Sequence, residues 1–351
     1  MSRRSSWSGR QVRRLVTAPA VIAVTVLIGV TFPLWLVAAA ALSPILPGHW
    51  RPLRLAWLMI LYLVCESVML VILFGLWISS GFGRRVRTPY FEGIHYDLVQ
   101  GLLWVFFREA RRVLNLTIET AGPTPDAHPG RPLLVCCRHA GPGDSFTLVY
   151  ALMHWYDREP RVVLKDTLAW DPAIDVLLHR IPARFISPNP KEGAGVEDQI
   201  AELATGLDEN DAFVIFPEGG NFTARRRERG IERLHKLGMH RMADRAEAMT
   251  NVLAPRPGGF LAALRAAPDA DVVMVAHTGM DHLLTVGDIW RELPMDKRLL
   301  MQWWQVPREE IPQDREDQIE WLFAWWERID LWINEHRAED LPVRRRGASA
   351  G

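Results

Sequence analysis

The hydrophobic and polar positions divide the chain into an apolar N-terminal part and an alternating C-terminal part. No charged side chain or histidine occurs from Leu15 to Gly48, and from Leu55 to Gly83 the only charged residue is Glu66. A membrane-spanning helix needs about 20 apolar residues, so each stretch is long enough to cross a bilayer. The pattern predicts a helical membrane hairpin over residues 15–87, with spans of about residues 15–46 and 55–81. Glu66 is expected to face the partner helix or the headgroup region.

Arginines flank this hairpin asymmetrically. Five arginines and no acid occur in residues 1–14, three more lie in residues 84–87, and the connector has only Arg51 and Arg54. By the positive-inside rule both ends of the hairpin are cytoplasmic. We therefore expect a multi-pass protein of the cell (inner) membrane with both termini and the later domain in the cytoplasm. A cleaved signal peptide is disfavoured because the run is too long, whereas re-entrant helices in place of full spans remain open.

An amphipathic pattern follows at residues 90–114, where apolar residues recur at helical spacing and Arg108, Arg111 and Arg112 end the pattern. Such a helix either lies on the membrane surface or packs on the cytosolic domain. The expected organisation is a basic tail, the hairpin, a connecting helix, an α/β domain and a disordered tail, at residues 1–14, 15–87, 88–120, 121–337 and 338–351.

Short apolar runs alternate with helical patterns beyond residue 121. The predicted strands cover residues 131–137, 161–164, 212–216, 251–254 and 271–277, and the predicted helices cover 145–155, 172–179, 196–207, 259–266 and 314–335. This alternation predicts an α/β fold with a mostly parallel or mixed sheet covered by helices.

Composition excludes several classes of protein. The 41 basic and 41 acidic residues give a net charge of zero, which argues against a nucleic-acid partner. Three cysteines exclude a disulfide scaffold and fit a reducing compartment, and the adjacent Cys136 and Cys137 are expected to be strand residues. Tryptophans crowd the C-terminal helix, which either docks on the bilayer or packs in the core.

The candidate chemistry begins after the first strand of this domain, with His139-Ala-Gly-Pro-Gly-Asp144. Two glycines and a proline predict a tight loop that folds Asp144 back toward His139. A carboxylate on one ring nitrogen would orient the histidine as a general base, and the acceptor's own hydroxyl would serve as nucleophile. The alternative is that Asp144 only caps the following helix. Backbone N–H groups of Gly141–Gly143 are the expected oxyanion donors.

A second motif, Phe216-Pro-Glu218-Gly219-Gly220, ends a later strand. A carboxylate and two glycines at the carboxyl end of a strand are typical of ligand sites in α/β folds. The glycines let backbone N–H groups approach an anionic ligand. No histidine or cysteine spacing indicates a metal site.

These two motifs, H-x4-D and F-P-E-G, resemble those of the PlsC-type glycerolipid acyltransferase family. Lys165-Asp-Thr-Leu168 followed by Pro172, and Val252-Leu-Ala-Pro255, resemble two further blocks of that family in the same order. The resemblance covers about residues 130–280 and extends to the membrane hairpin. It implies that His139, oriented by Asp144, is the general base, and that the later motifs bind donor and acceptor. The substrate-binding residues expected on this basis are Lys165, Glu218, Gly219, Gly220, Arg225, Pro255 and Arg256.

The chain departs from the family where phosphate is recognised. The third block usually reads F-P-E-G-T-R, but here Gly220 and Asn221 stand in place of the last two residues. The second block also lacks its usual arginine, and Arg184 precedes it. A charged hydrogen bond to phosphate contributes about 1.5–3 kcal/mol, so replacements are expected. Candidates are Arg225, Arg226, Arg227, Arg229, Arg256 and Lys191, although the arginine run equally fits a solvated helix face.

The resemblance implies a membrane-bound O-acyltransferase of phospholipid biosynthesis. It would move a fatty acyl group from acyl-CoA or acyl-ACP, its co-substrate, to a lysophospholipid such as 1-acyl-sn-glycerol-3-phosphate, without a cofactor or a metal. The alternatives are an acyltransferase or transacylase of lipid remodelling, a thioesterase and a non-catalytic membrane scaffold.

Overall fold

A computed structural model describes residues 7–46, 50–122, 130–141, 143–186, 195–281, 286–293 and 295–337. Its centre is a seven-stranded sheet in the order β1-β7-β6-β2-β5-β3-β4. The strands are β1 Leu116–Ala121, β2 Leu133–Cys137, β3 Glu159–Lys165, β4 Ala183–Ile186, β5 Asp211–Ile215, β6 Asp271–Thr278 and β7 Lys297–Val306. The helices are α1 Trp7–Leu42, α2 Arg51–Ser79, α3 Pro89–Leu114, α4 Asp144–Trp155, α5 Pro172–Leu178, α6 Val196–Ala204, α7 Ala224–Lys236, α8 His240–Ala248, α9 Pro257–Ala266, α10 Val286–Glu292 and α11 Arg315–His336. Two short 3-10 helices cover Asp166–Trp170 and Arg308–Glu310.

Strand direction decides where the functional motifs meet. Strands β6, β2, β5, β3 and β4 are parallel, whereas β7 is antiparallel to β6 and carries β1 parallel to itself. The sheet is therefore mixed and mostly parallel, as the sequence predicts. The carboxyl ends of β6, β2, β5 and β3 lie at one edge, which is where α/β folds place their ligands.

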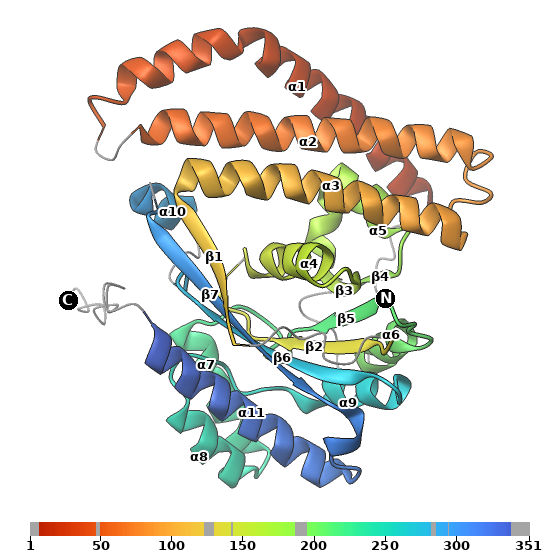
Figure 1. Ribbon diagram of the computed structural model, residues 1–351, viewed down its shortest axis with the longest axis vertical. Coiled ribbons are helices and arrows are strands. Elements are labelled where there is room, and N and C mark those ends of the chain that lie inside the picture. Colours follow the sequence, from red (N-terminus) through yellow and green to blue (C-terminus); the bar gives the residue numbers. More distant parts are fainter. Residues whose placement is uncertain are drawn as a thin grey trace.

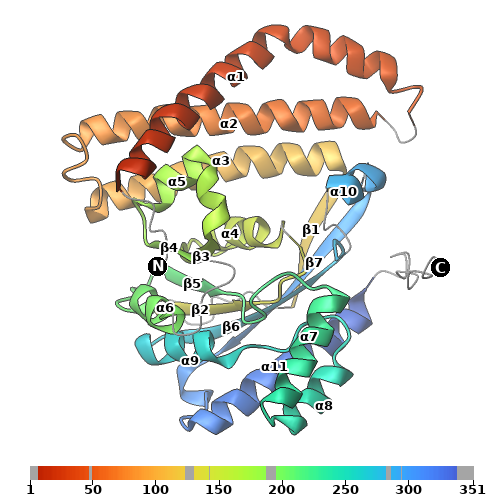
Figure 2. The ribbon, with the colours of Figure 1, turned by 180° about the vertical axis from the view of Figure 1, so that it is seen from behind.

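The two faces of the sheet build two cores. In β2, Leu134 and Cys136 enter the core formed with α6, α8, α9 and α11, whereas Leu133, Val135 and Cys137 enter the core formed with α3 and α4. This alternation follows from the two-residue period of a strand. Figures 1 and 2 show α11, α8 and α9 on one side of the sheet and α3 with the α1–α2 hairpin on the other.

Several strands differ from the sequence prediction. β1, β4 and β7 are strands that the hydrophobic pattern did not identify, and β1 lies in part of the predicted connecting helix. Residues 251–254 are not a strand, because their backbone groups bond to side chains instead. The carbonyl of Asn251 accepts from Arg138, and the N–H of Leu253 donates to Glu218.

The tryptophan-rich helix α11 packs in the core. Trp326 is fully buried, Trp321 stacks on Phe260 at a ring-centroid distance of 5.9 Å, and Trp325 lies 5.9 Å from Trp304. Core packing rather than bilayer docking therefore accounts for these tryptophans, because α11 lies on the sheet face away from the hairpin (Figure 1).

Helices α1 and α2 form the predicted apolar hairpin, and both are long and apolar enough to cross a membrane. α1 begins earlier than the sequence suggests, at Trp7 in the part that the structure describes. Its outer side chains are uncovered: Leu15 is 74% exposed and Val30 is 76% exposed. Exposed apolar area of this extent is typical of a membrane or partner surface.

The hairpin lies along the α/β domain, with α2 beside α3 (Figures 1 and 2). Near the start of α1, Arg13 and Arg14 pair with the buried Asp175 of α5. At the start of α2, Arg51 donates to the carbonyls of Arg291 and Leu293, and Arg54 donates to the carbonyl of Val113. The domain therefore holds both ends of the hairpin, including the connector end.

Glu66 faces α5 of the α/β domain rather than the partner helix of the hairpin. Its carboxylate is buried and accepts a hydrogen bond from the N–H of Ala173 in α5 at 3.0 Å. Glu66 is therefore part of the contact between hairpin and domain. Nearby, the hydroxyl of Tyr62 donates to Asp171, which caps α5.

Candidate active site

His139 and Asp144 come together in the loop that follows β2. His139 Nδ1 lies 3.4 Å from Asp144 Oδ2, and the same oxygen accepts from the N–H of Gly141 at 2.6 Å. Asp144 is the first residue of α4, but its side chain forms no hydrogen bond with its own helix end. It bonds backward to the loop instead, so simple helix capping does not describe its role. The ring of Phe216 lies 4.6 Å from that of His139 and restricts its orientation.

A second histidine, His277, shares the Asp144 carboxylate. His277 Nε2 lies 3.6 Å from Asp144 Oδ2 and 3.3 Å from the carbonyl oxygen of Arg138. Sequence reasoning missed this residue because His277 lies far along the chain, near the end of β6. The available signal was its strand position, since β6 pairs with β2 and ends at the same edge.

Burial and hydrogen bonding determine the protonation states of His277 and Asp144. Burial lowers the pKa of His277, which favours its neutral form. Burial alone would raise the pKa of Asp144, but interactions with His277, His139 and Gly141 outweigh it and hold that pKa below its ordinary value. The carboxylate is therefore ionised at neutral pH and is available to stabilise positive charge on His139.

Buried Arg138 ties this edge together. Its guanidinium donates to the carbonyl of His277 at 2.7 Å, to Asp281 at 2.5 Å and to the carbonyl of Asn251 at 3.3 Å. Arg138 directly precedes His139, so these bonds anchor the backbone of the loop. A buried charge held in this way is costly to unpair, by about 3–5 kcal/mol when one partner is removed.

Glu218 supports the same loop from the end of β5. One carboxylate oxygen accepts from the N–H of His139 at 3.1 Å, and the other accepts from the N–H of Leu253 at 3.0 Å. The side chain is 2% exposed, and burial raises its pKa to about 7. Both oxygens are thus occupied by backbone donors. Glu218 therefore braces the loop of His139, and its expected contact with substrate stays a prediction.

Two arginines lie over the glycines that follow Glu218. Gly219 has a φ of +70°, and a Cβ there would come within 3.1 Å of the Arg256 guanidinium. A Cβ on Gly220 would come within 2.8 Å of Arg226, which also donates to the carbonyl of Asn221 at 3.0 Å. Glycine at these positions therefore makes room for two cations. Desolvation, followed by the like charges of Arg233 and Arg226, lowers the pKa of Arg256.

Comparison with known proteins concerns the segment that holds this site. Residues 116–277, which contain His139, Asp144, Glu218 and His277, match a family model described as Acyltransferase. This segment is therefore similar to acyltransferase domains. No curated protein sequence matches the chain.

A solved structure has a similar fold. It is described as the 1-acyl-sn-glycerophosphate (LPA) acyltransferase PlsC from Thermotoga maritima, with a TM-score of 0.50 and 12% sequence identity. The superposition covers 81% of this chain and 97% of the bacterial one. At this identity the likeness shows the fold alone.

The remaining expected site residues of the α/β domain are spread more widely. Lys165 is exposed at the carboxyl end of β3, Pro255 is buried beside Arg256, and Arg225 is exposed in the first turn of α7. Arg227 is structural, because it donates to the carbonyls of Met249 and Glu247. Exposed Arg229 lies further along α7, and Arg184 pairs with Glu202. Lys191 lies outside the described residues.

The loop between β2 and α4 bears on the expected oxyanion donors. The N–H of Gly141 is engaged by Asp144, so it is not the oxyanion donor that the loop was expected to supply. Pro142 lies outside the described residues. Within the part of the chain that the structure describes, no group of three histidine, cysteine or acidic side chains has the geometry of a metal site.

Glu218→Gln should change the pH dependence of the stability of the α/β domain. The pKa of Glu218 is about 7 in the fold against 4.5 for an ordinary glutamate, so the folded state binds this proton more tightly. That contribution is full below pH 4.5 and is lost as the pH rises toward 7. Because glutamine does not titrate, the melting temperature of the variant should rise relative to wild type over this interval, on top of a constant loss from one backbone bond.

Thermal unfolding in neutral detergent at several pH values measures this difference. Glu335→Gln, at an exposed position on α11, is the matched control and should show no such trend. A difference between Glu218→Gln and wild type that stays constant between pH 4.5 and 7 would contradict the assignment.

Proposed function

We propose that this protein is a membrane-bound acyltransferase that transfers an acyl group from a thioester to the free hydroxyl of a lysophospholipid. The observation that carries the proposal is the pairing of His139 with the buried Asp144 at the carboxyl edge of the sheet, in a segment similar to acyltransferase domains. The exposed apolar hairpin beside that domain supports lipids as substrate and product. Acyl-CoA and acyl-ACP are both suitable soluble donors.

The mechanism follows from the direction of each hydrogen bond. With Nδ1 of His139 held toward Asp144, Nε2 accepts the proton of the acceptor hydroxyl. The oxygen attacks the thioester carbonyl, and collapse of the tetrahedral intermediate breaks the carbon–sulfur bond. The departing sulfur takes the proton back from His139. Asp144 stabilises the imidazolium that exists between these two transfers.

The negative charge of the tetrahedral intermediate would be stabilised by groups at the start of α4. Gly141 is committed to Asp144 and a proline has no N–H, so Gly143 is the remaining glycine donor of the loop. The positive end of the α4 dipole adds to this effect. Removing one such donor in other acyl-transfer enzymes costs about 10²–10³ in rate.

The acceptor phosphate is assigned to Arg256 and Arg226. They border the loop of Glu218, where the usual threonine and arginine of this family are replaced by Gly220 and Asn221. Two guanidinium groups on adjacent glycines offer the geometry for a phosphate monoester. This arrangement favours 1-acyl-sn-glycerol-3-phosphate among lysophospholipid acceptors.

Arg256→Gln should therefore raise the KM for 1-acyl-sn-glycerol-3-phosphate by about tenfold or more, with a smaller change in kcat, because a charged phosphate contact is lost. Initial rates at varied acceptor concentration measure this split. Arg265→Gln, an exposed arginine in the last turn of α9, serves as the control. An unchanged KM in Arg256→Gln would remove this residue from the acceptor site.

We place the hairpin in the cytoplasmic leaflet of the inner membrane, with the α/β domain in the cytoplasm. The bonds of Arg51 and Arg54 to the domain support an in-plane or re-entrant hairpin over two full spans, since they hold the connector on the same side as the active site. The acceptor lipid would then reach His139 laterally from that leaflet.

The direct test supplies purified full-length protein in detergent with labelled acyl-CoA and 1-acyl-sn-glycerol-3-phosphate, and follows free thiol and the diacyl product. Formation of both in equal amounts supports the proposal. Acyl transfer only from intact phospholipid would indicate a transacylase, and free fatty acid without acceptor would indicate a thioesterase. No turnover with acyl-CoA, acyl-ACP or phospholipid would indicate a scaffold.

A further inference from the structure

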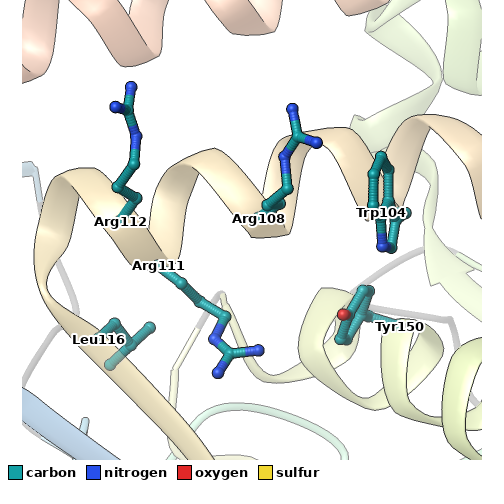
Figure 3. A pocket seen from close by; sticks show the side chains of 6 residues that line it. All are labelled: Trp104, Arg108, Arg111, Arg112, Leu116 and Tyr150. Carbon is teal, nitrogen blue, oxygen red and sulfur yellow. The ribbon is translucent and has the colours of Figure 1, made fainter.

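A basic hollow lies between the C-terminal half of α3, β1 and α4, apart from the active-site residues described above. Its volume is about 370 Å³ (Figure 3). The residues that line it are Trp104, Arg108, Arg111, Arg112, Leu116 and Tyr150. A second hollow of about 550 Å³ also includes Arg111 and continues along β1 past Ile118 and Glu119. Arg111 therefore stands between two adjoining open spaces.

The acidic side chains of this region are already paired. Glu109 lies 2.8 Å from Arg112 and 3.7 Å from Arg108, and Glu119 pairs with Arg298. Among the residues that the structure describes, Arg111 has no carboxylate partner. The three arginines of the hollow therefore face the single carboxylate of Glu109, which is shared by Arg108 and Arg112. The negative end of the α3 dipole favours a basic residue at the position of Arg111. That interaction does not use the hydrogen-bond donors of the guanidinium, so they are available to a ligand.

The walls of the hollow are rigid and aromatic. Tyr150 stacks between Phe107 and His154, each at a ring-centroid distance of 4.5 Å. Arg108 lies over the ring of Trp104 at 4.6 Å. In Figure 3, Arg108 and Arg112 point toward the hairpin, while Arg111 points the other way, toward β1 and α4. All three arginines line the same hollow, which therefore has guanidinium groups on its hairpin side and on the side of β1 and α4.

The position of α3 indicates where such an anion would come from. Packed helices lie about 8–10 Å apart, and α3 is the layer directly beneath α2 (Figures 1 and 2). The headgroup layer of one leaflet is about 5–8 Å thick, since a bilayer measures about 40–45 Å with headgroups and about 30 Å without them. If the hairpin lies in the leaflet, α3 is therefore at headgroup depth.

We propose that Arg111, flanked by Arg108 and Arg112, binds the phosphate of an anionic phospholipid headgroup as a docking site separate from the acceptor site. The proposal rests on the membrane placement given above but does not depend on acyl transfer. Guanidinium groups suit a phosphodiester because they supply paired donors in a fixed geometry. Such a contact would orient the domain on its membrane surface.

Thermal unfolding of the full-length protein in neutral detergent micelles tests the site, since a ligand that binds only the folded state raises the melting temperature. Short-chain phosphatidylglycerol, short-chain phosphatidylcholine and inorganic phosphate are titrated separately. We expect phosphatidylglycerol to raise the melting temperature of wild type and to bind Arg111→Gln about tenfold or more weakly. Arg111→Lys, which keeps the charge but loses the paired donors, should fall between the two.

Arg265→Gln is the matched control, an exposed arginine of α9 on the sheet face away from the hairpin, and should respond as wild type does. Equal phosphatidylglycerol affinity in Arg111→Gln and wild type would overturn the proposal. So would an equal response to phosphatidylcholine, or to inorganic phosphate at the same concentration. The measurement repeated in His139→Ala separates this site from catalysis, because lipid binding should persist where acyl transfer is lost.

Discussion

Replacing His139 with alanine should lower kcat for acyl transfer by about 10²–10⁴-fold, the contribution of a general base. In the proposed mechanism this side chain accepts the proton of the acceptor hydroxyl, with Nδ1 facing Asp144. The fold should survive, because the bonds that anchor this position use the backbone. The N–H of His139 donates to Glu218 and its carbonyl accepts from Phe222.

Transfer of a labelled acyl chain from acyl-CoA to the lysolipid measures this loss, and thermal unfolding checks that the variant is folded. His235→Ala, at an exposed position on α7, is the control and should keep wild-type activity. Full activity in a folded His139→Ala protein would rule out the proposed chemistry.

Asp144→Asn should lower kcat by about 10²-fold, with little change in the KM for either substrate. Asparagine keeps the shape but removes the negative charge that stabilises the imidazolium. One carboxylate oxygen serves the N–H of Gly141 and lies near both His139 and His277. A neutral amide is a weaker acceptor for these three donors, so the ring of His139 is also held less firmly.

The matched control is Asp317→Asn, an exposed residue in the first turn of α11. Steady-state kinetics on both variants separate kcat from KM. An Asp144→Asn protein that retains half of the wild-type kcat would show that the carboxylate only shapes the loop.

Much of the fold was predictable from local pattern. The hairpin, α3, α4 and the buried strands β2, β5 and β6 follow from hydrophobic period, because each period places one face of an element in a core. β1 was not predicted because only one residue separates Leu116 from the end of α3, so the predicted helix was extended over the strand. Residues 251–254 have the apolar character of a strand, but their bonds to Arg138 and Glu218 come from distant side chains.

Some site residues were likewise predictable from local sequence, whereas others were not. His139 and Asp144 were found because both belong to one short loop, whose glycines and proline restrict the backbone. His277, the two occupied oxygens of Glu218 and the choice of Arg226 and Arg256 among several arginines were not found. They depend on strand order, which brings residues from β6, β2 and β5 to one edge.

By itself the sequence determined an apolar hairpin, an alternating α/β domain and a histidine–aspartate motif, because each is written in residues close together along the chain. Only the tertiary structure decided that Arg51 and Glu66 join the hairpin to the domain, that Glu218 braces the catalytic loop and that Arg111 stands without a carboxylate partner among the described residues. The physical reason is that charged and polar side chains are satisfied by whichever donors and acceptors packing brings near them, and local periodicity does not encode those long-range neighbours.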